Sequence, residues 1–282
     1  YFSRNIFSSE YVSFCTLFFL LGLVDDLKIS IAPKFRLIIM IAFLITLVIS
    51  NEIYIKKTGL EFLDNLVVID IFSLMFICLC FLFIINGSNL IDGFNGLLGI
   101  HSLIIFIVLF AINLINENNN LIYILFYVSL LTLIFLKFNF PKAQIFLGDS
   151  GAYLIGILIA ISVIKTSNLN PSISPFFFCI LLFYLFFEVF FSFFRKLFVV
   201  RQSPLLPDNQ HLHMSLYKLL LKKNKTKLSS NYTVSICINL IYLSLIIPGI
   251  IFMNNGLFCR YYFFSLLIIY IYFYKMLYKK VK

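Results

Sequence analysis

A polar stretch from Asn86 to Gly96 interrupts a chain that consists almost entirely of long apolar runs. It reads Asn-Gly-Ser-Asn-Leu-Ile-Asp-Gly-Phe-Asn-Gly, so a polar side chain recurs at every third residue. A carboxylate at membrane depth is costly unless it faces a protein interior, water or a cation. The stretch therefore predicts a functional site rather than a lipid-facing surface. Its polar residues are Asn86, Asn89, Asp92 and Asn95, with Gly87, Gly93 and Gly96 between them.

The composition around this stretch is that of a membrane protein. The 282 residues are 62% hydrophobic and only 12% charged, with a mean hydropathy of +1.03. Such values exclude a soluble globular domain. Apolar runs of span length between short polar loops predict an all-α, polytopic transmembrane helix bundle, which we expect to form a single domain over residues 1–282. About nine spans are expected, at 11–24, 35–50, 66–85, 97–115, 121–138, 151–164, 175–194, 232–253 and 261–277.

The basic residues gather on one side of this predicted membrane. Alternate loops, at 25–36, 86–96, 137–150, 195–231 and after residue 275, hold most of the 22 lysines and arginines. By the positive-inside rule these loops face the cytoplasm. The net charge of +10 then reflects topology and anionic lipid, and we expect no nucleic-acid partner. The basic residues outside these loops are Arg4, Lys56, Lys57, Lys165 and Arg260.

The polar motifs of the chain fall on this same side. They are the pair Asp25-Asp26 at the end of the first span, Asp149 and the segment His211-Leu-His213. A transporter would carry its polar breaks near the middle of its spans, and often on both sides. Clustering at one interface instead suits an enzyme that joins a water-soluble reactant to a membrane-bound one.

Each acidic motif has a structural reading beside the functional one. Asp25 and Asp26 project about 100° apart on a helix, so one could contact a substrate or cation while the other pairs with Lys28. The structural reading is that both carboxylates are a charged flank at the end of the span. Asp149 could cap a helix. It could equally bind magnesium, which uses few carboxylates and keeps positions for water and phosphate oxygens. For Asp92 the structural reading is a polar re-entrant turn.

The largest predicted cytoplasmic loop carries groups suited to phosphate. Arg201, Asp208, His211 and His213 could hold a pyrophosphate through charge and hydrogen bonds, whereas the structural reading is a solvated basic loop. A zinc site would need more ligands than this loop offers. Phe146, ahead of Asp149, could stack on a nucleobase or serve in packing.

In order along the chain, these motifs resemble the polyprenyl-phosphate N-acetylhexosamine-1-phosphate transferase superfamily. The resemblance runs from about residue 20 to residue 217. It implies transfer of a sugar 1-phosphate from a UDP-N-acetylhexosamine to undecaprenyl (polyprenyl) phosphate, with release of UMP and with Mg²⁺ as cofactor. It also implies a multi-pass protein of the bacterial inner membrane. The matching motifs are Leu-Val-Asp25-Asp26, the stretch from Asn86 to Leu97, Asn139 to Ala143 with Ile-Phe146-Leu-Gly-Asp149-Ser-Gly, and the His-x-His loop.

The resemblance also implies roles for individual residues. Asp149 would coordinate magnesium, and Asp25 would be the leading candidate to deprotonate the lipid phosphate. The two histidines would hold the pyrophosphate or sugar phosphate. The expected catalytic residues are Asp25, Asp26, Asp92 and Asp149, and the expected substrate-binding residues are Asn86, Asn89, Gly93, Asn95, Asn139, Phe146, Arg201, Asp208, His211 and His213.

Three positions depart from the family pattern. Asn95 replaces a frequent second aspartate, Asn209 a frequent arginine and Met214 a third histidine. They favour the O-antigen-initiating branch, which acts on a UDP-N-acetylhexosamine, over the MurNAc-pentapeptide enzyme. We also expect this chain to lack the family's first helices. The alternatives are a transporter that uses Asp92 and Glu188, or an inactive family member, and a homodimer is compatible with the sequence.

Overall fold

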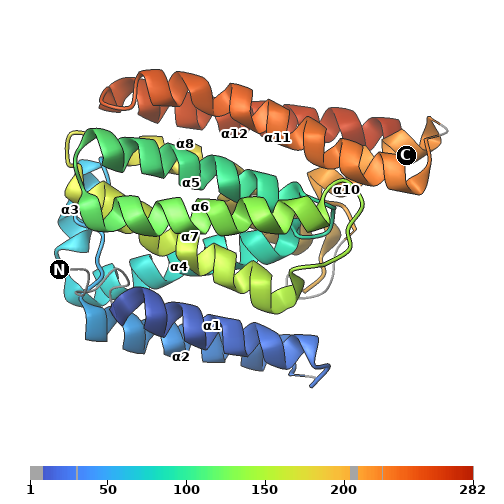
Figure 1. The fold of residues 1–282 in the computed structure, drawn as a ribbon. Coiled ribbons are helices and arrows are strands. Elements are labelled where there is room, and N and C mark those ends of the chain that lie inside the picture. The colour runs from blue at the N-terminus through green and yellow to red at the C-terminus, as the bar shows by residue number, and fades with distance from the viewer. Residues whose placement is uncertain (1–8, 30, 204–208, 224, 282) are drawn as a thin grey trace.

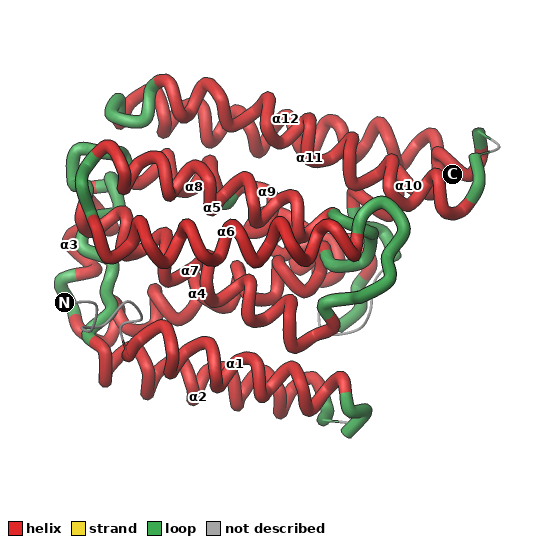
Figure 2. Tube along the Cα trace, viewed as in Figure 1, coloured by secondary structure: helices red, strands yellow, loops and turns green. Residues whose placement is uncertain are grey.

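The computed structural model describes residues 9–29, 31–203, 209–223 and 225–281, and within these ranges the chain forms helices and loops without a strand (Figure 2). The predicted all-α class is therefore confirmed. The helices are α1 (Ser9–Asp26), α2 (Pro33–Asn51), α3 (Glu61–Val67), α4 (Asp70–Ile91), α5 (Leu97–Ile115), α6 (Asn119–Asn139), α7 (Gly148–Leu169), α8 (Pro175–Leu181), α9 (Phe183–Phe194), the π-helix η1 (Arg195–Val200), α10 (Leu212–Lys222), α11 (Lys227–Ile251) and α12 (Gly256–Val281).

Seven of the described helices, namely α2, α4, α5, α6, α7, α11 and α12, are long and apolar enough to cross a membrane. A further span is formed if α8 and the continuous segment Phe183–Val200 count together, although the chain bends by 75° between them. The predicted span 11–24 corresponds to α1, whose 18 residues include carboxylates near both ends. The protein is thus a polytopic helix bundle, with fewer straight spans than the nine expected.

Helix ends near the polar motifs differ from the prediction. Helix α4 continues to Ile91 instead of ending at residue 85, so Asn86 and Asn89 are helical rather than in a loop. The side-chain amide of Asn86 donates to the carbonyl of Leu82, one turn back in the same helix, at 2.8 Å. Hydropathy marks where a helix leaves the apolar region, whereas backbone hydrogen bonds decide where it ends. The long loop 195–231 likewise contains η1 and α10.

Helix α7 is the centre of the bundle, and α1, α4 and α5 all pack against it. Glycine permits two of these contacts. A Cβ at Gly22 of α1 would lie 2.4 Å from the backbone of Ser150, and a Cβ at Gly156 would lie 2.8 Å from the Cα of Ile85 in α4. Backbones in such close contact leave no room for side chains between them. The ends of α1, α4 and α7 are therefore held together.

The polar motifs meet at one end of this bundle. In Figure 1 the turn after α1, the α4–α5 turn, the α6–α7 connection and the start of α10 all lie at the right-hand end, opposite the α11–α12 turn. We call it the site end, defined by Asp25, Asp26, Asp92 and Asp149. The predicted alternation of the loops places these same four residues on one side.

Candidate active site

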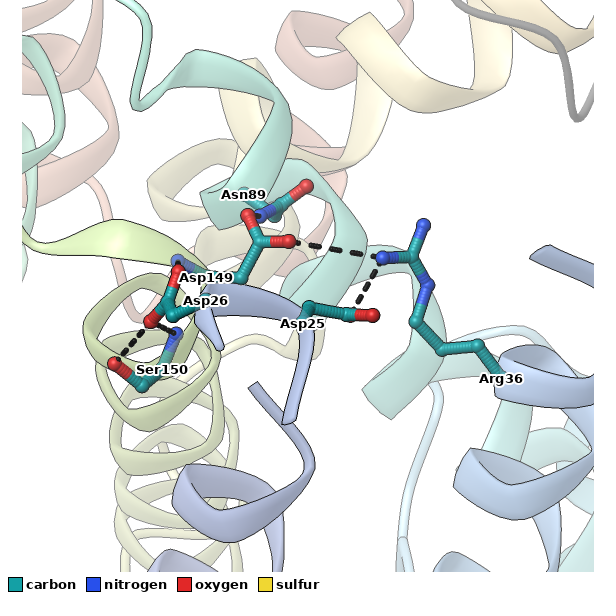
Figure 3. Close-up of polar contacts among 6 residues, drawn as sticks. All are labelled: Asp25, Asp26, Arg36, Asn89, Asp149 and Ser150. Carbon is teal, nitrogen blue, oxygen red and sulfur yellow. Dashed lines mark hydrogen bonds and ion pairs between the residues drawn. The ribbon is translucent and has the colours of Figure 1, made fainter. Parts of the chain in front are cut away.

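Asp26 caps the start of helix α7 from a different helix. One of its carboxylate oxygens accepts from the backbone N–H of Asp149 at 2.8 Å (Figure 3). The other accepts from the N–H and the hydroxyl of Ser150, at 3.0 and 2.6 Å. Gly148 adopts φ +66°, and a Cβ there would lie 2.6 Å from the Asp26 carboxylate, so glycine is required. The capping role considered for Asp149 is wrong, because Asp26 satisfies these N–H groups instead.

Arg36 bridges two carboxylates at the site end. Its Nη1 lies 2.6 Å from Asp25 Oδ2 and 3.6 Å from Asp149 Oδ2 (Figure 3). Asn89 donates to the other oxygen of Asp149 at 2.7 Å. Helices α1, α2, α4 and α7 thus contribute one side chain each. The sequence predicts Arg36 only as a basic loop residue and offers Lys28 as a partner for one carboxylate of the acidic pair. The signal in the sequence that could have indicated this bridge is the position of Arg36: it lies at the start of the span that follows the acidic pair, on the same side of the membrane.

Asp92 occupies the turn between α4 and α5 and is half-buried. The described residues provide no hydrogen-bond donor to its carboxylate. Burial, reinforced by the negative charges of Asp149 and Asp26, raises the pKa of Asp92 to about 7. A re-entrant turn filled by side-chain hydrogen bonds would have given this carboxylate partners. The Asp92 carboxylate instead experiences the negative charges of two other carboxylates, Asp149 and Asp26.

Two predicted substrate-binding residues hold the loops of the site end in place. Asn139 is buried, and its amide oxygen accepts from the N–H of Gly96 at 2.6 Å while its nitrogen donates to the carbonyl of Ile145 at 2.8 Å. Asn95 donates to the carbonyl of Pro141 at 2.9 Å. A carboxylate could not donate that hydrogen bond. Asn139 therefore joins the α4–α5 turn to the α6–α7 connection, and the hydrogen bond from Asn95 gives its departure from the family pattern a local structural reason. Substrate contacts by Asn95 and Asn139 stay predictions.

The other predicted binding residues lie around this scaffold. Phe146, in the α6–α7 connection, is 77% exposed and its ring is available for stacking. Gly93 is exposed, and a Cβ there would approach only the side chain of Met214, at 3.8 Å. Arg201 follows η1 and is exposed, with φ at 55°. Asp208 lies outside the described residues. Substrate contacts by these residues stay predictions.

The two loop histidines are buried against α9. Their rings stack with centroids 5.4 Å apart, and His211 Nδ1 lies 3.1 Å from Glu188 while His213 Nδ1 lies 3.1 Å from the hydroxyl of Tyr184. Burial lowers the pKa of His213 to about 4, so its ring is neutral at pH 7. The His213 ring also meets Phe94 of the Asp92 turn, with centroids 5.7 Å apart. The interpretation of this segment as a solvated loop is therefore wrong for both histidines, which are buried at the site end.

Two polar residues inside spans have structural partners. His101 is fully buried, with its Nδ1 3.2 Å from the amide oxygen of Asn239, and is a structural histidine. Glu188 is 1% exposed and accepts from the N–H of Leu212 and from the hydroxyl of Tyr270. Glu188 is therefore a buried carboxylate held by structural partners. An enclosed carboxylate of this kind does not line a water-filled transport path.

The fold and the site define a multi-pass membrane protein with an acidic site at one end of its helix bundle. The chain belongs to glycosyl transferase family 4, whose sequence pattern matches residues 10–167. That range contains Asp25, Arg36, Asp92 and Asp149. The resemblance to the polyprenyl-phosphate N-acetylhexosamine-1-phosphate transferase superfamily is thereby confirmed.

Curated relatives of two kinds are similar to this chain. Undecaprenyl-phosphate alpha-N-acetylglucosaminyl 1-phosphate transferase of Thermotoga maritima is 28% identical over 196 residues, which cover 69% of this chain and 57% of the relative. The Escherichia coli protein of that name is 26% identical over 215 residues, covering 73% of this chain and 57% of the relative. Phospho-N-acetylmuramoyl-pentapeptide-transferase of Dictyoglomus turgidum is 30% identical over 246 residues, which cover 84% of this chain and 74% of the relative. The chain thus spans little more than half the length of the first two proteins.

Proposed function

We propose that this protein transfers a sugar 1-phosphate from a UDP-N-acetylhexosamine to undecaprenyl phosphate or a similar polyprenyl phosphate, and releases UMP. The observation that carries the proposal is the cluster of Asp25, Arg36, Asn89 and Asp149, with Asp92 in the adjacent turn, at one end of a membrane helix bundle. A lipid can reach this end from the bilayer and a nucleotide can reach it from water. The names of the relatives support the same reaction class.

The proposed chemistry is a phosphoryl transfer. An oxygen of the lipid phosphate attacks the phosphorus that bears the sugar, and the bond from this phosphorus to the UMP oxygen breaks. UMP leaves with the electron pair, and the product is a lipid-linked diphosphate sugar. In such reactions the protein mainly positions the reactants and offsets their charge. The Arg36 guanidinium, already held by two carboxylates, is suited to orienting phosphate oxygens.

The donor set at Asp149 fits a magnesium ion. Its side chain is 37% exposed, although Asn89 and Arg36 lie close to its two oxygens. Magnesium commonly binds through one or two carboxylates and completes its shell with water and substrate phosphates. The described residues hold no group of three or more His, Cys, Asp or Glu that could form an all-protein cage. Asp149 would hold the ion, which when bound would neutralise charge on the diphosphate.

Asp92 is a better candidate than Asp25 to accept a proton from the lipid phosphate. The carboxylate of Asp25 pairs with Arg36 at 2.6 Å, so it is engaged before substrate arrives. Burial and the neighbouring carboxylates raise the pKa of Asp92 to about 7, and none of the described residues donates a hydrogen bond to its carboxylate. A general base works best when its pKa lies near the operating pH. We therefore propose that Asp92 accepts the proton and that Asp25 holds Arg36.

The proposed donor is UDP-N-acetylglucosamine or another UDP-N-acetylhexosamine. The departures at Asn209 and Met214 favour this branch of the family, and relatives with N-acetylglucosaminyl names support it. The product would then start a cell-envelope polysaccharide such as the lipopolysaccharide O-antigen. The excess of basic residues in the loops of the site end supports a bacterial inner-membrane location with the site facing the cytoplasm.

To test this function, the protein in proteoliposomes is incubated with magnesium, UDP-N-acetylglucosamine and undecaprenyl phosphate, and UMP is measured. We expect UMP only when the lipid phosphate is present. Asp149→Asn should abolish the magnesium-dependent turnover, whereas Asp70→Asn, an exposed carboxylate at the start of α4, should not. Lack of lipid-dependent UMP from every UDP-N-acetylhexosamine would contradict the proposal. Nucleotide-sugar binding without turnover would indicate an inactive member.

A further inference from the structure

A polar cavity lies at the end of the bundle opposite the site end, where the α2–α3 connection meets the α7–α8 connection and the start of α12 (Figure 1). Its volume is about 190 Å³. The polar side chains that line it are two cations and three uncharged groups, and no described carboxylate lines it. They are Lys57, Arg260, Ser172, Ser174 and Asn254. The cavity therefore has the charge of a site for an anion, and it is separate from the site end.

Arg260 is held in place in this cavity while part of its guanidinium stays unoccupied. Its Nη2 donates to the carbonyl of Gly59 at 2.5 Å, and the guanidinium carbon lies over the ring of Phe176, 5.7 Å from its centroid. Nε is buried, and neither Nε nor Nη1 has a hydrogen-bond partner among the described residues. No described carboxylate forms an ion pair with Arg260. A fixed guanidinium with free N–H groups is suited to binding an oxyanion.

Lys57 adds a second charge without a counterion. Its side chain is exposed and forms no ion pair or hydrogen bond with a described residue. Asp64, in the helix that follows, accepts instead from the N–H and the hydroxyl of Thr58, at 2.6 and 2.7 Å. The exposed Ser172 hydroxyl also has no described partner and can donate a hydrogen bond. Two cations and a free hydroxyl thus surround one space, which attracts an anion with several acceptor oxygens.

An apolar hollow adjoins the cavity. It is open to the outside, shares Asn254 and Arg260 with the cavity, and is also lined by Ile251, Phe252 and Leu257. These three side chains are exposed. Helix α11 ends and α12 begins here, and both helices are apolar enough to span a membrane, so the hollow lies near the membrane surface. A phosphate in the cavity could therefore carry acyl chains that cover the hollow.

We propose that this cavity binds a phosphate group, and that the adjoining hollow favours the phosphate of a membrane phospholipid over free phosphate. Arg260 and Lys57 pair with the phosphate oxygens, Ser172 donates a hydrogen bond, and the acyl chains lie against the apolar side chains of the hollow. Bound in this way, the lipid would link the α2–α3 connection to α12. The inference goes beyond the proposed function and does not depend on it, because no residue of the site end takes part.

The test places a reporter in the hollow and leaves the cavity intact. In a variant whose six native cysteines are replaced, Ile251→Cys carries a trifluoromethyl tag, and its ¹⁹F NMR signal is followed in detergent during titration with dihexanoyl phosphatidylglycerol. We expect a saturable shift. Lys57→Gln should weaken the binding about fivefold, the usual contribution of one basic residue to holding an anionic lipid. Lys56→Gln is the matched control: it removes an exposed neighbouring lysine that does not line the cavity and should leave the affinity unchanged.

Two further ligands distinguish the sources of the phosphate. Dihexanoylglycerol has the same acyl chains without phosphate and should bind at least fivefold more weakly. Equal binding would overturn the proposal, because apolar contact alone would then explain the shift. Displacement of the phospholipid by sodium phosphate, but not by sodium chloride at the same ionic strength, would support the phosphate site and show that free phosphate enters it as well. Selective binding of the phospholipid without such displacement would support the lipid as the source.

A second variant keeps the proposal falsifiable if the first fails to fold. Ser172→Asp adds a negative charge at an exposed position of the cavity and should weaken phosphatidylglycerol binding at least as much as Lys57→Gln. Thermal unfolding in detergent shows whether each variant is folded. Wild-type affinity in the folded variants would overturn the proposal. Since this readout requires no catalysis, a protein that makes no UMP refutes the proposed function and leaves the phosphate site standing.

Discussion

At the level of single residues, Arg36 is expected to determine how Asp25 and Asp149 are held. Arg36→Ala leaves two neighbouring carboxylates without their shared cation, and charge-assisted hydrogen bonds contribute roughly 1.5–3 kcal/mol. We expect kcat/KM for UMP release to fall about 10- to 100-fold. Arg36→Lys should keep part of the activity, because one ammonium can pair with Asp25 but lacks the planar fork of arginine. Lys34→Ala, an exposed position on the same helix, is the control and should leave the rate unchanged.

Asp92 gives a prediction about pH. Its pKa of about 7 means that, without a bound cation, the carboxyl is protonated below pH 7 and ionises as the pH rises through that value. Dicyclohexylcarbodiimide modifies protonated carboxyl groups in apolar surroundings. We therefore expect labelling of Asp92, measured by mass spectrometry, to be strong below pH 7 and to decline above it. Magnesium should reduce the labelling below pH 7, because a nearby cation favours the ionised form.

The assignment of the Asp92 carboxylate as general base also predicts how turnover depends on pH. A general base must be ionised to act, so the rate should rise with pH on the acidic side and level off above the pKa of the base. If Asp92 is the base, Asp92→Asn should remove this rise along with most of the rate, whereas Asp25→Asn should lower the rate and keep the rise. The opposite pattern would restore Asp25 as the proton acceptor.

Among the helices, the junction between α1 and α7 is the element on which the site most depends. Gly148→Ala would place a Cβ 2.6 Å from the carboxylate of Asp26 and force a left-handed φ on alanine. We expect a loss of about 1–3 kcal/mol in stability from the strained backbone. The displaced Asp26 should also release the start of α7 and disturb Asp149. Thermal unfolding in mild detergent and the UMP assay measure the two effects.

The control for Gly148→Ala is another glycine at the site end. Gly93 lacks a positive φ, and an added Cβ would meet only the flexible end of Met214 at 3.8 Å. Gly93→Ala should therefore unfold at the wild-type temperature. Equal stability of the two alanine variants would show that the Asp26 cap does not need glycine at position 148.

The helices themselves could be predicted from the sequence better than their ends. Apolar runs predicted α2, α5 and α6 nearly as they stand, because hydropathy alone defines a lipid-spanning segment. The predicted end of α4 was wrong, because the Asn86 side chain donates a hydrogen bond within its own helix. The predicted start of α7 was wrong, because Asp26 caps this helix from α1. The carboxylates of the site were recognisable from their cost in a membrane. The bridge by Arg36 was not, since it depends on which helices become neighbours.

For the whole molecule, both chemistry and charge distinguish the two ends of the bundle. The site end gathers the carboxylates, Arg36 and the histidine loop, while the basic residues near the α11–α12 turn at the opposite end include Lys57, in the α2–α3 connection, and Arg260, in the second turn of α12. Basic residues are retained on the cytoplasmic side during insertion. A nucleotide sugar is made in the cytoplasm, so the same asymmetry would give the site access to its donor. The topology and the proposed function therefore depend on each other and can be tested together.

That topology predicts which loops react with a membrane-impermeant maleimide. In a variant whose six native cysteines are replaced, Lys142→Cys probes the exposed α6–α7 connection at the site end, and Asn254→Cys probes the exposed α11–α12 turn at the other. In intact spheroplasts we expect Asn254→Cys to be labelled and Lys142→Cys to be protected. Permeabilising the membrane should expose Lys142→Cys to the reagent. The reverse pattern would place Asp149 and Arg36 outside the cell, where a cytoplasmic nucleotide sugar cannot reach them, and would contradict the proposed donor along with the topology.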